Sequence, residues 1–392
     1  MGGRAVIKFG GADLSSGERI RKAAKMVIES EYDEILVVVS AMGETTNKLI
    51  KIINQLGGIS DKDYAEIVSM GERTSARIFS AALKALGVKS TYIEPSQERW
   101  PIITDSNFIG AKPILDETRR RVKEYIEPLL GDCIPVVCGF LGLDRFGNIT
   151  TLGRGGSDVT ALLLGNCLGA DEVILVKATE GVMSADPKIV PHARPLSRLT
   201  IHEMFALAHG GAKIVKAEAL RYKLPNQRLR IVSFSNGLKS GGTEITGTFN
   251  ANSFEIAERK GLTAISLVCE IKPRVMSKLF TELNERPIYG VSTGKTSITI
   301  FTSAGDDANL IRRIHDAGIS KAVSCRGRVG LIEITHPSFI DSPGWVAKIS
   351  GALASKGINI IEITTSKATI NIFIDESRLE DAIKAIGDVI EA

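Results

Sequence analysis

The side chains best suited to chemistry are concentrated in one short stretch, Thr150–Thr160, which reads Thr-Thr-Leu-Gly-Arg-Gly-Gly-Ser-Asp-Val-Thr. Its glycines let the backbone approach a ligand closely, and a helix beginning directly after them would point free N–H groups at an anion. Arg154 can grip a carboxylate or a phosphate through two parallel hydrogen bonds, and Asp158 can orient a lysine or a metal ion. The alternative is an ordinary glycine-rich turn into a helix, capped by Ser157 or Asp158. The stretch therefore predicts an anion site, with a simple turn as the competing interpretation.

A second candidate lies near the N-terminus, where a short apolar run ends in Lys8-Phe9-Gly10-Gly11. A lysine at the end of a strand can reach phosphate oxygens while glycine N–H groups hold them. Many ordinary turns have the same composition. Neither GxxxxGK[ST] nor GxGxxG in its strand-turn-helix context occurs, which argues against a P-loop and against a dinucleotide site.

Three further polar segments interrupt or follow apolar runs. Glu72 lies early in a helical pattern, within Ser69–Arg77, and could face a cleft or simply form local ion pairs. Ser40–Asn47 follows a buried strand, where α/β proteins bind ligands, but Thr46 and Asn47 are also good helix caps. Lys177–Lys188 follows another buried strand and suits either a nucleotide or a polar loop.

The elements that must position these residues alternate along the first 245 residues. Helical patterns cover Arg19–Ser30 and Tyr64–Leu86. Strands alternating with helices predict a parallel or mostly parallel sheet covered on both sides. The predicted strands are Ala5–Phe9, Glu34–Ser40, Lys89–Ile93, Ile134–Gly139, Glu172–Val176 and Arg230–Ser235.

The alternation of strands and helices ends in a glycine- and asparagine-rich linker, and a tandem repeat follows the linker. Each copy, of about 70 residues, has a helix, two strands and a closing helix. The paired strands are 288–294 with 296–302 and 358–365 with 368–374, and the closing helices are 306–317 and 376–390. A further strand, Lys321–Arg326, is predicted only for the first copy, because the chain ends before the second could add one.

Composition excludes several classes of protein. Of 392 residues, 49 are Lys or Arg and 45 are Asp or Glu, so the net charge of +4 gives no support for nucleic-acid binding. The five cysteines form no CxxC pair and are typical of a reduced, cytoplasmic protein. The five histidines lack metal-ligand spacing, so no metal site is expected. We expect neither a signal peptide nor a membrane span.

Taken together, these motifs resemble the amino-acid kinase superfamily and, within it, the aspartate kinases (aspartokinases). The resemblance rests on Lys8–Gly11, Gly71–Arg73, Thr150–Asp158, Ser184–Lys188 and Gly211–Val215, and it covers essentially the whole chain. The tandem repeat resembles paired ACT domains, with Ser342–Ile349 and Gly357–Ile360 close to their pattern. The resemblance implies a catalytic domain (1–245), a linker (246–260) and two ferredoxin-like βαββα(β) ACT units (261–328 and 329–392).

The resemblance also implies roles for individual residues. Lys8 would stabilise the transferred phosphoryl group, and Asp158 would hold Lys8 in place. Arg154 and Ser157 would bind the α-carboxylate of aspartate, Glu72 its ammonium, and Thr46 would lie nearby. ATP, accompanied by Mg²⁺, would be bound by Lys8, Gly10, Gly11, Lys177, Ala178, Met183, Lys188, Lys213 and Ile214.

The catalytic part of the chain departs from the aspartokinase pattern at two places, and the first ACT unit at a third. The usual Thr-Ser after Lys-Phe-Gly-Gly is replaced by Ala12-Asp13, and Asp13 would repel an acidic substrate unless it turns away or binds a cation. The usual Thr-Asp-Val-x-Gly of the nucleotide loop is replaced by Lys177-Ala178-Thr179-Glu180-Gly181, which looks more like uridylate kinase. In the first ACT unit, Lys272-Pro273-Arg274 replaces Asp-x-Pro-Gly, so its effector site is in question.

The leading hypothesis is an enzyme that phosphorylates the side-chain carboxylate of L-aspartate with ATP, the first step towards lysine, threonine and methionine. The ACT pair would bind an amino-acid effector, lysine or threonine, and would pair between chains in a homodimer because sheet edges seek partners. Two alternatives remain: a kinase for another small acid or a nucleoside monophosphate, and a non-catalytic amino-acid sensor.

Overall fold

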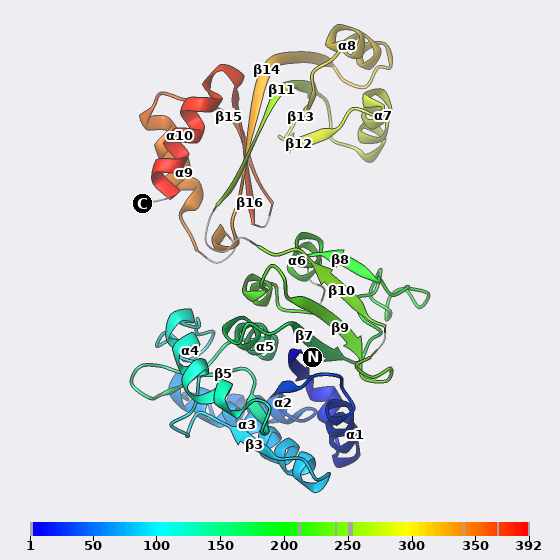
Figure 1. Cartoon of the computed structure of the whole chain (residues 1–392). Coiled ribbons are helices and arrows are strands. Elements are labelled where there is room, and N and C mark those ends of the chain that lie inside the picture. The colour runs from blue at the N-terminus through cyan, green and yellow to red at the C-terminus, as the bar shows by residue number, and fades with distance from the viewer. Residues whose placement is uncertain are drawn as a thin grey trace. The chain divides into compact units, whose positions relative to one another are not determined.

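Strands and helices alternate through the first part of the chain, and an antiparallel sheet dominates the rest (Figure 1). The structure is a computed structural model that describes residues 3–210, 212, 214–239, 241–249, 254–339, 342–366 and 368–390. The chain divides into two units, residues 1–249 and 250–392. None of the described helices is long and apolar enough to span a membrane.

The first unit is built on an eight-stranded sheet in the order β3-β4-β2-β1-β7-β9-β10-β8, in which only the β9–β10 pair is antiparallel. A two-stranded ribbon, β5–β6, lies beside it. The strands are β1 Arg4–Phe9, β2 Glu34–Val39, β3 Ser90–Ile93, β4 Ile134–Cys138, β5 Leu141–Leu143, β6 Ile149–Thr151, β7 Glu172–Lys177, β8 Arg198–Thr200, β9 Arg228–Ser233 and β10 Thr243–Thr246.

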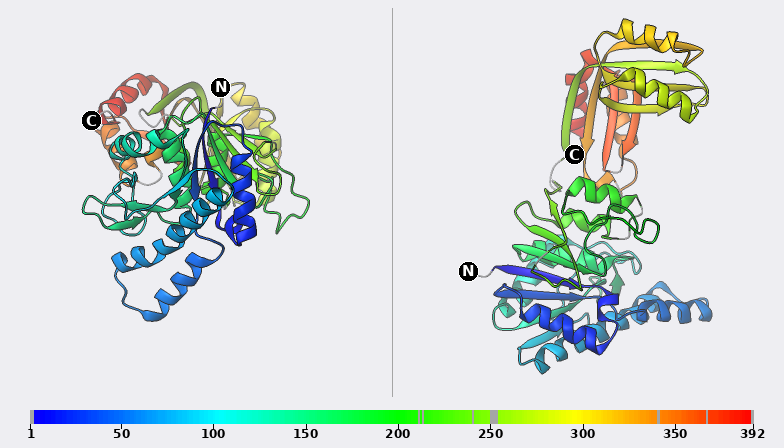
Figure 2. Two further views of the ribbon diagram at one scale, coloured as in Figure 1. Left: turned by 60° about the horizontal axis from the view of Figure 1, so that its bottom comes forward. Right: turned by 90° about the vertical axis from the view of Figure 1, so that its right-hand side faces the viewer.

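Helices cover both faces of this sheet. Alternation along β1 shows how: the Phe9 ring packs 5.4 Å from Phe79 of α3, whereas Lys8 points to the opposite face, toward α5. The helices are α1 Gly17–Ile28, α2 Thr45–Leu56, α3 Asp61–Ala85, α4 Leu115–Arg121, α5 Gly156–Cys167 and α6 Ile201–His209, with short helices η1 Gly11–Leu14, η2 Val122–Ile126, η3 Glu127–Leu129 and η4 Ala217–Tyr222. The hairpin of α2 and the start of α3 projects from the body of the unit (Figure 2).

The second unit holds a six-stranded sheet in the order β12-β13-β11-β14-β16-β15, with every neighbouring pair antiparallel. Its elements are β11 Glu255–Val268, α7 Pro273–Leu283, β12 Ile288–Thr293, β13 Ser297–Ser303, α8 Asp307–Asp316, β14 Ala322–Thr335, η5 Pro337–Phe339, α9 Trp345–Ser355, β15 Ile360–Ser366, β16 Thr369–Asp375, η6 Glu376–Arg378 and α10 Leu379–Ile390.

Two long strands are shared between the two copies of the repeat. The second half of β11 pairs with the first half of β14, next to β13. The other ends of the same strands also pair, Glu255–Arg259 of β11 with Leu331–Thr335 of β14, next to β16. Register shifts between Arg259 and Ala264, with Gly261 at a positive φ of 70°, mark the change from one copy to the other.

The expectation that the second copy lacks its last strand is therefore wrong. Its fourth strand comes from Glu255–Arg259, a segment that precedes the first copy in the chain and falls inside the predicted linker. The sequence repeat could not reveal this, because strand pairing is set by register in space rather than by chain order. The predicted boundary between residues 328 and 329 likewise falls inside β14.

The core of the second unit has three parts. Buried aliphatic side chains pack under α7 and α8 in the first copy and under α9 and α10 in the second. Between the copies, the rings of Phe301 and Phe373 stack with centroids 3.8 Å apart. The mostly parallel sheet between helices, followed by an antiparallel sheet with helices, confirms the predicted fold class.

Candidate active site

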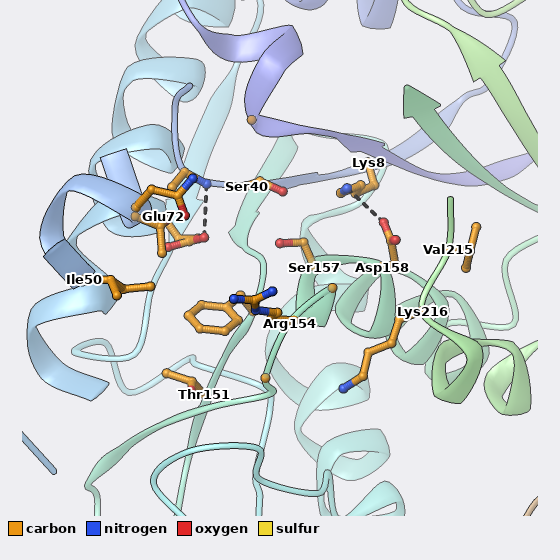
Figure 3. A pocket seen from close by; sticks show the side chains of 18 of the residues that line it. Lys8, Ser40, Ile50, Glu72, Thr151, Arg154, Ser157, Asp158, Val215 and Lys216 are labelled. Carbon is orange, nitrogen blue, oxygen red and sulfur yellow. Dashed lines mark hydrogen bonds and ion pairs between the residues drawn. The ribbon is translucent and has the colours of Figure 1, made fainter. Parts of the chain in front are cut away.

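One large cavity, of about 1000 Å³, opens at the carboxyl ends of the central strands of the first unit (Figure 3). It lies at the end of β1, which has β2 on one side and β7 on the other. The strand order therefore changes direction at β1. Such a switch point is where open parallel sheets bind ligands. Its lining is Lys8, Gly11, Ser40, Ala41, Gly43, Thr46, Asn47, Ile50, Tyr64, Glu72, Ile109, Phe140, Thr151, Gly153, Arg154, Gly155, Gly156, Ser157, Asp158, Lys177, Ile214, Val215 and Lys216.

At one end of the cavity, two lysines hold one buried carboxylate. Lys8 Nζ lies 2.8 Å from Asp158 Oδ1, and Lys177 Nζ lies 3.0 Å and 2.9 Å from the two carboxylate oxygens. Burial alone would raise the pKa of Asp158, but the two lysines outweigh it and lower that pKa to about 2. Asp158 is therefore a fixed anion that orients both ammonium groups.

Asp158 is placed by the tight turn at the start of α5. Gly153 and Gly155 have φ of 72° and 74°, a left-handed conformation that favours glycine. Gly155 is the N-cap of α5 and no side chain caps the helix, so the simple capping interpretation of Ser157 and Asp158 is wrong. Both side chains are free to face the cavity, beside the positive end of the helix dipole.

Arg154 lies between the two ends of the cavity. Figure 3 shows its guanidinium extending into the open space, with Glu72 on one side and the Lys8–Asp158 pair on the other, and Ser157 close by. The Arg154 side chain is exposed, whereas Ser157 is buried. A cation beside a hydroxyl at a helix N-terminus is suited to binding a carboxylate.

At the other end of the cavity, Glu72 of α3 is buried in a different environment. Its Oε1 accepts a hydrogen bond of 3.1 Å from the Ala41 N–H, while Oε2 has no hydrogen-bond partner among the described residues. Burial raises the pKa of Glu72 to about 7, although Ala41 and the Lys8 charge act in the opposite direction. Gly71 allows this approach, since a Cβ there would lie 2.7 Å from the Ala41 Cβ.

Asp13, the residue that departs from the aspartokinase pattern, turns away from the cavity. Its Oδ2 accepts a 3.2 Å hydrogen bond from Gly10 N–H, and Arg19 Nη2 lies 3.5 Å from Oδ1. The same arginine donates a 3.0 Å hydrogen bond to the Ala12 carbonyl. The predicted phosphate contact at Gly10 is thus not supported, because its N–H is already engaged.

The structure brings most of the predicted site residues together. Those that line the cavity are Lys8, Gly11, Thr46, Glu72, Arg154, Ser157, Asp158, Lys177 and Ile214. Ala178, Met183 and Lys188 lie instead in the segment after β7, outside the cavity lining, and Ala178 and Lys188 are exposed. Lys213 falls outside the described residues.

Five lining residues were not predicted: Ile50, Tyr64, Ile109, Phe140 and Lys216. Phe140 has a φ of 71°, rare for a residue with a side chain, and directly follows Gly139, which packs against Ser157. Lys216 donates a 2.9 Å hydrogen bond to the Leu152 carbonyl. The phenylalanine after the glycine that follows β4 was a usable sequence signal for this loop, but the other four residues have no such local signal.

Comparison with known proteins identifies the family. Residues 3–233 match the amino acid kinase family, and residues 326–388 match an ACT domain. The aspartokinase of Corynebacterium efficiens is 30% identical, over 98% of this chain and 95% of its own length. The chain belongs to the aspartokinase family. The resemblance inferred from the motifs is confirmed.

Solved aspartokinase structures share the fold. Aspartate kinase from Synechocystis superposes with a TM-score of 0.72 at 25% identity, covering 99% of this chain and 70% of that one. E. coli aspartokinase III, solved in complex with aspartate and ADP, gives a TM-score of 0.58 at 20% identity, covering 99% of this chain and all of that one.

Proposed function

We propose that this aspartokinase-family chain phosphorylates the side-chain carboxylate of L-aspartate with ATP, giving 4-phospho-L-aspartate and ADP. The observation that carries the proposal is the order of charges along one cavity. Glu72 comes first, with a carboxyl oxygen that has no partner among the described residues. The Arg154 guanidinium lies between, and the Lys8–Asp158–Lys177 cluster lies at the far end.

This order of charges complements an amino acid with two carboxylates. Glu72 Oε2 would accept a hydrogen bond from the substrate ammonium, which supplies the partner that the oxygen lacks. Arg154 and Ser157 would bind the α-carboxylate, with Thr46 beside it. The side-chain carboxylate would then point toward the lysines.

At the lysine end, catalysis requires position and charge rather than a covalent enzyme group. An oxygen of the aspartate side chain attacks the γ-phosphorus in line, a new O–P bond forms, and the bond to the β–γ bridging oxygen breaks so that ADP leaves. The attacking carboxylate is already ionised and needs no general base. Lys8 would stabilise the negative charge on the transferred phosphoryl group, and Asp158 would keep Lys8 in place.

The magnesium ion that accompanies ATP fits this site as part of the nucleotide. Both oxygens of Asp158 are engaged by lysines, and no group of three or more His, Cys, Asp or Glu side chains suited to a metal occurs among the described residues. Phosphate oxygens and water would therefore supply most of its ligands, as is common for Mg²⁺.

The second unit would regulate the first. We assign residues 1–245 to the catalytic domain and the ACT pair beyond the linker to an effector-binding domain that pairs between chains in a homodimer. Support comes from the ACT match and from E. coli aspartokinase III, which was also solved with lysine and aspartate in a T-state. Lysine or threonine would be the effector, in keeping with a first step towards lysine, threonine and methionine.

ADP release on addition of substrate tests the catalytic proposal. We expect turnover with L-aspartate and none above background with L-glutamate, with UMP, or with succinate, which lacks the ammonium that Glu72 would bind. Turnover with UMP would favour a nucleoside monophosphate kinase. No turnover with any acceptor, together with binding of an amino acid, would favour a non-catalytic sensor.

A further inference from the structure

The phosphoryl-transfer end of the cavity holds more charge than one lysine and its carboxylate. Lys8 comes from β1 and Lys177 from the adjacent strand β7, and their side chains converge on Asp158 of α5. Lys177 hydrogen bonds to both carboxylate oxygens, at 3.0 Å and 2.9 Å, and also lines the cavity. Each ammonium group has three donors, so both can bind Asp158 and a phosphate oxygen at once.

A buried lysine and a partly buried one on a single carboxylate would leave an excess positive charge. Asp13 supplies a further negative charge nearby: it is 1% exposed, and a Cβ on Gly10 would lie 3.2 Å from Asp13 Oδ2 and 3.9 Å from Lys8 Nζ. Burial raises the pKa of Asp13, whereas the charges of Lys8, Arg19 and Lys177 act in the opposite direction. Its Oδ1 accepts no hydrogen bond within the described part of the chain, and only the Arg19 guanidinium approaches it, at 3.5 Å. An apolar or hydroxyl side chain at this position would not provide that charge.

We propose that Lys177 is a second catalytic lysine, which donates to the transferred phosphoryl group together with Lys8, and that Asp13 is a positioning residue that balances its charge. The inference rests on the proposed kinase function. It also gives one physical reason for both departures of the sequence: a lysine added at residue 177 comes with a carboxylate added at residue 13.

The groups that face Lys177 set the pH at which it works. Burial and the Lys8 charge lower the pKa of Lys177 to about 8, whereas Asp158 acts in the opposite direction. The charge of Asp13 acts on both lysines from outside the cavity lining, and Arg19 of α1 pairs with Asp13. Turnover that needs the protonated amine should fall as the pH rises above about 8.

Substitution of Lys177 tests the catalytic role. Lys177→Met should lower kcat by about 10²- to 10³-fold, the typical cost of losing one transition-state donor. Lys177→Arg should retain more activity and lose the alkaline fall, because a guanidinium stays charged. Lys239→Met, which removes an exposed lysine 3.6 Å from Glu31, is the matched control and should change nothing. A Lys177→Met enzyme within threefold of wild type, or an alkaline fall that persists in Lys177→Arg, would overturn the proposal.

A double-mutant cycle tests Asp13. Asp13→Asn should move the alkaline fall of kcat to lower pH and reduce kcat about tenfold, but should have little further effect in the Lys177→Met background. Additive losses would show that Asp13 acts independently of Lys177. Thermal unfolding of each variant separates these effects from loss of fold.

Nucleotide binding keeps this inference separate from the identity of the acceptor. By isothermal titration, Lys177→Met should weaken the non-hydrolysable analogue AMP-PNP about tenfold or more and leave ADP almost unchanged, since Lys177 would contact only the third phosphate. Wild-type protein that fails to turn over aspartate but shows this difference would refute the aspartate proposal alone. Equal loss for both nucleotides would refute the role of Lys177.

Discussion

Each end of the cavity holds a buried carboxyl group, yet the pKa values of the two groups are shifted in opposite directions. Glu72 has one backbone N–H and a distant lysine, and burial raises its pKa to about 7. Asp158 has two ammonium groups within 3.0 Å, and its pKa falls to about 2. The difference shows that burial alone does not set the charge of an acidic side chain; its number of cationic partners does.

Each state suits a different task. An ionised Asp158 holds lysines in a fixed direction before any ligand arrives. Glu72 instead has no cationic partner in contact within the part of the chain that the structure describes, so a substrate ammonium would complete its environment. The comparison therefore separates a pre-assembled end of the site from an end that the substrate itself would complete.

The largest expected effect comes from the pre-assembled end. Lys8→Ala should reduce turnover by on the order of 10³-fold or more, because it removes a cation from the charge developing in phosphoryl transfer. The rate of ADP release, measured beside the thermal unfolding of the same variant, checks this. Near-normal activity in a folded Lys8→Ala protein would remove Lys8 from the mechanism.

The substrate-completed end should respond in affinity rather than in rate. Glu72→Gln should raise KM for aspartate about 10- to 100-fold with a smaller change in kcat, because the amide lacks the charge that attracts an ammonium. In wild type, KM should rise as the pH falls below about 7, where Glu72 gains a proton, and this dependence should vanish in Glu72→Gln. A pH-independent wild-type KM would contradict the assignment.

Stability should show the same asymmetry. The ordinary pKa of Glu72, 4.5, is raised to about 7 in the folded chain, so between these values the unfolded chain loses a proton that the folded chain keeps. The stabilisation from protonated Glu72 is therefore present below about pH 4.5 and is lost as the pH rises through 7. At pH 8, Glu72→Gln should be more stable than wild type by about 1–3 kcal/mol in the free energy of unfolding, and should unfold at a higher temperature. This difference in stability should shrink at pH 5.

A smaller effect should follow from crowding the Glu72 end. Gly71→Ala places a methyl group 2.7 Å from the Ala41 Cβ, which should cost about 1–3 kcal/mol and raise KM for aspartate moderately. Gly387→Ala is the matched control, because apart from its chain neighbours and the backbone of α10 itself no described atom lies within 4 Å of the added methyl. It should leave KM unchanged and slightly raise the unfolding temperature.

The sequence could predict the parts of the site that lie at strand ends or in tight turns. Lys8, Lys177 and the turn before Asp158 each follow directly from a local pattern, and parallel strands bring such ends to one edge of the sheet. The predicted strands of the first unit all occur, with small differences at their ends. Local patterns suffice where position follows from chain direction.

Local patterns do not suffice where a side chain is oriented by a residue from another element of the fold. The direction of Asp13 depends on Arg19 of the following helix, which itself packs on Phe234 at the end of β9 with its guanidinium carbon 4.3 Å from the ring centroid. The engagement of Gly10 by Asp13 could not be seen for the same reason. Similarly, Tyr64 reaches the cavity because α2 and α3 form a hairpin, a tertiary fact without a sequence signature.

The sharing of β11 and β14 has a consequence for how the C-terminal unit is assembled. Glu255–Arg259 leaves the ribosome before the whole first copy of the repeat, but its partner, Leu331–Thr335, emerges only after it. These early residues remain an unpaired strand edge while about 70 more residues are made. Pairing the two segments closes a long loop and therefore has a high contact order. The second copy is therefore not a contiguous segment of the chain, and removal of the residues between Arg259 and Leu331 would detach one of its strands, so the two copies should unfold in a single cooperative transition.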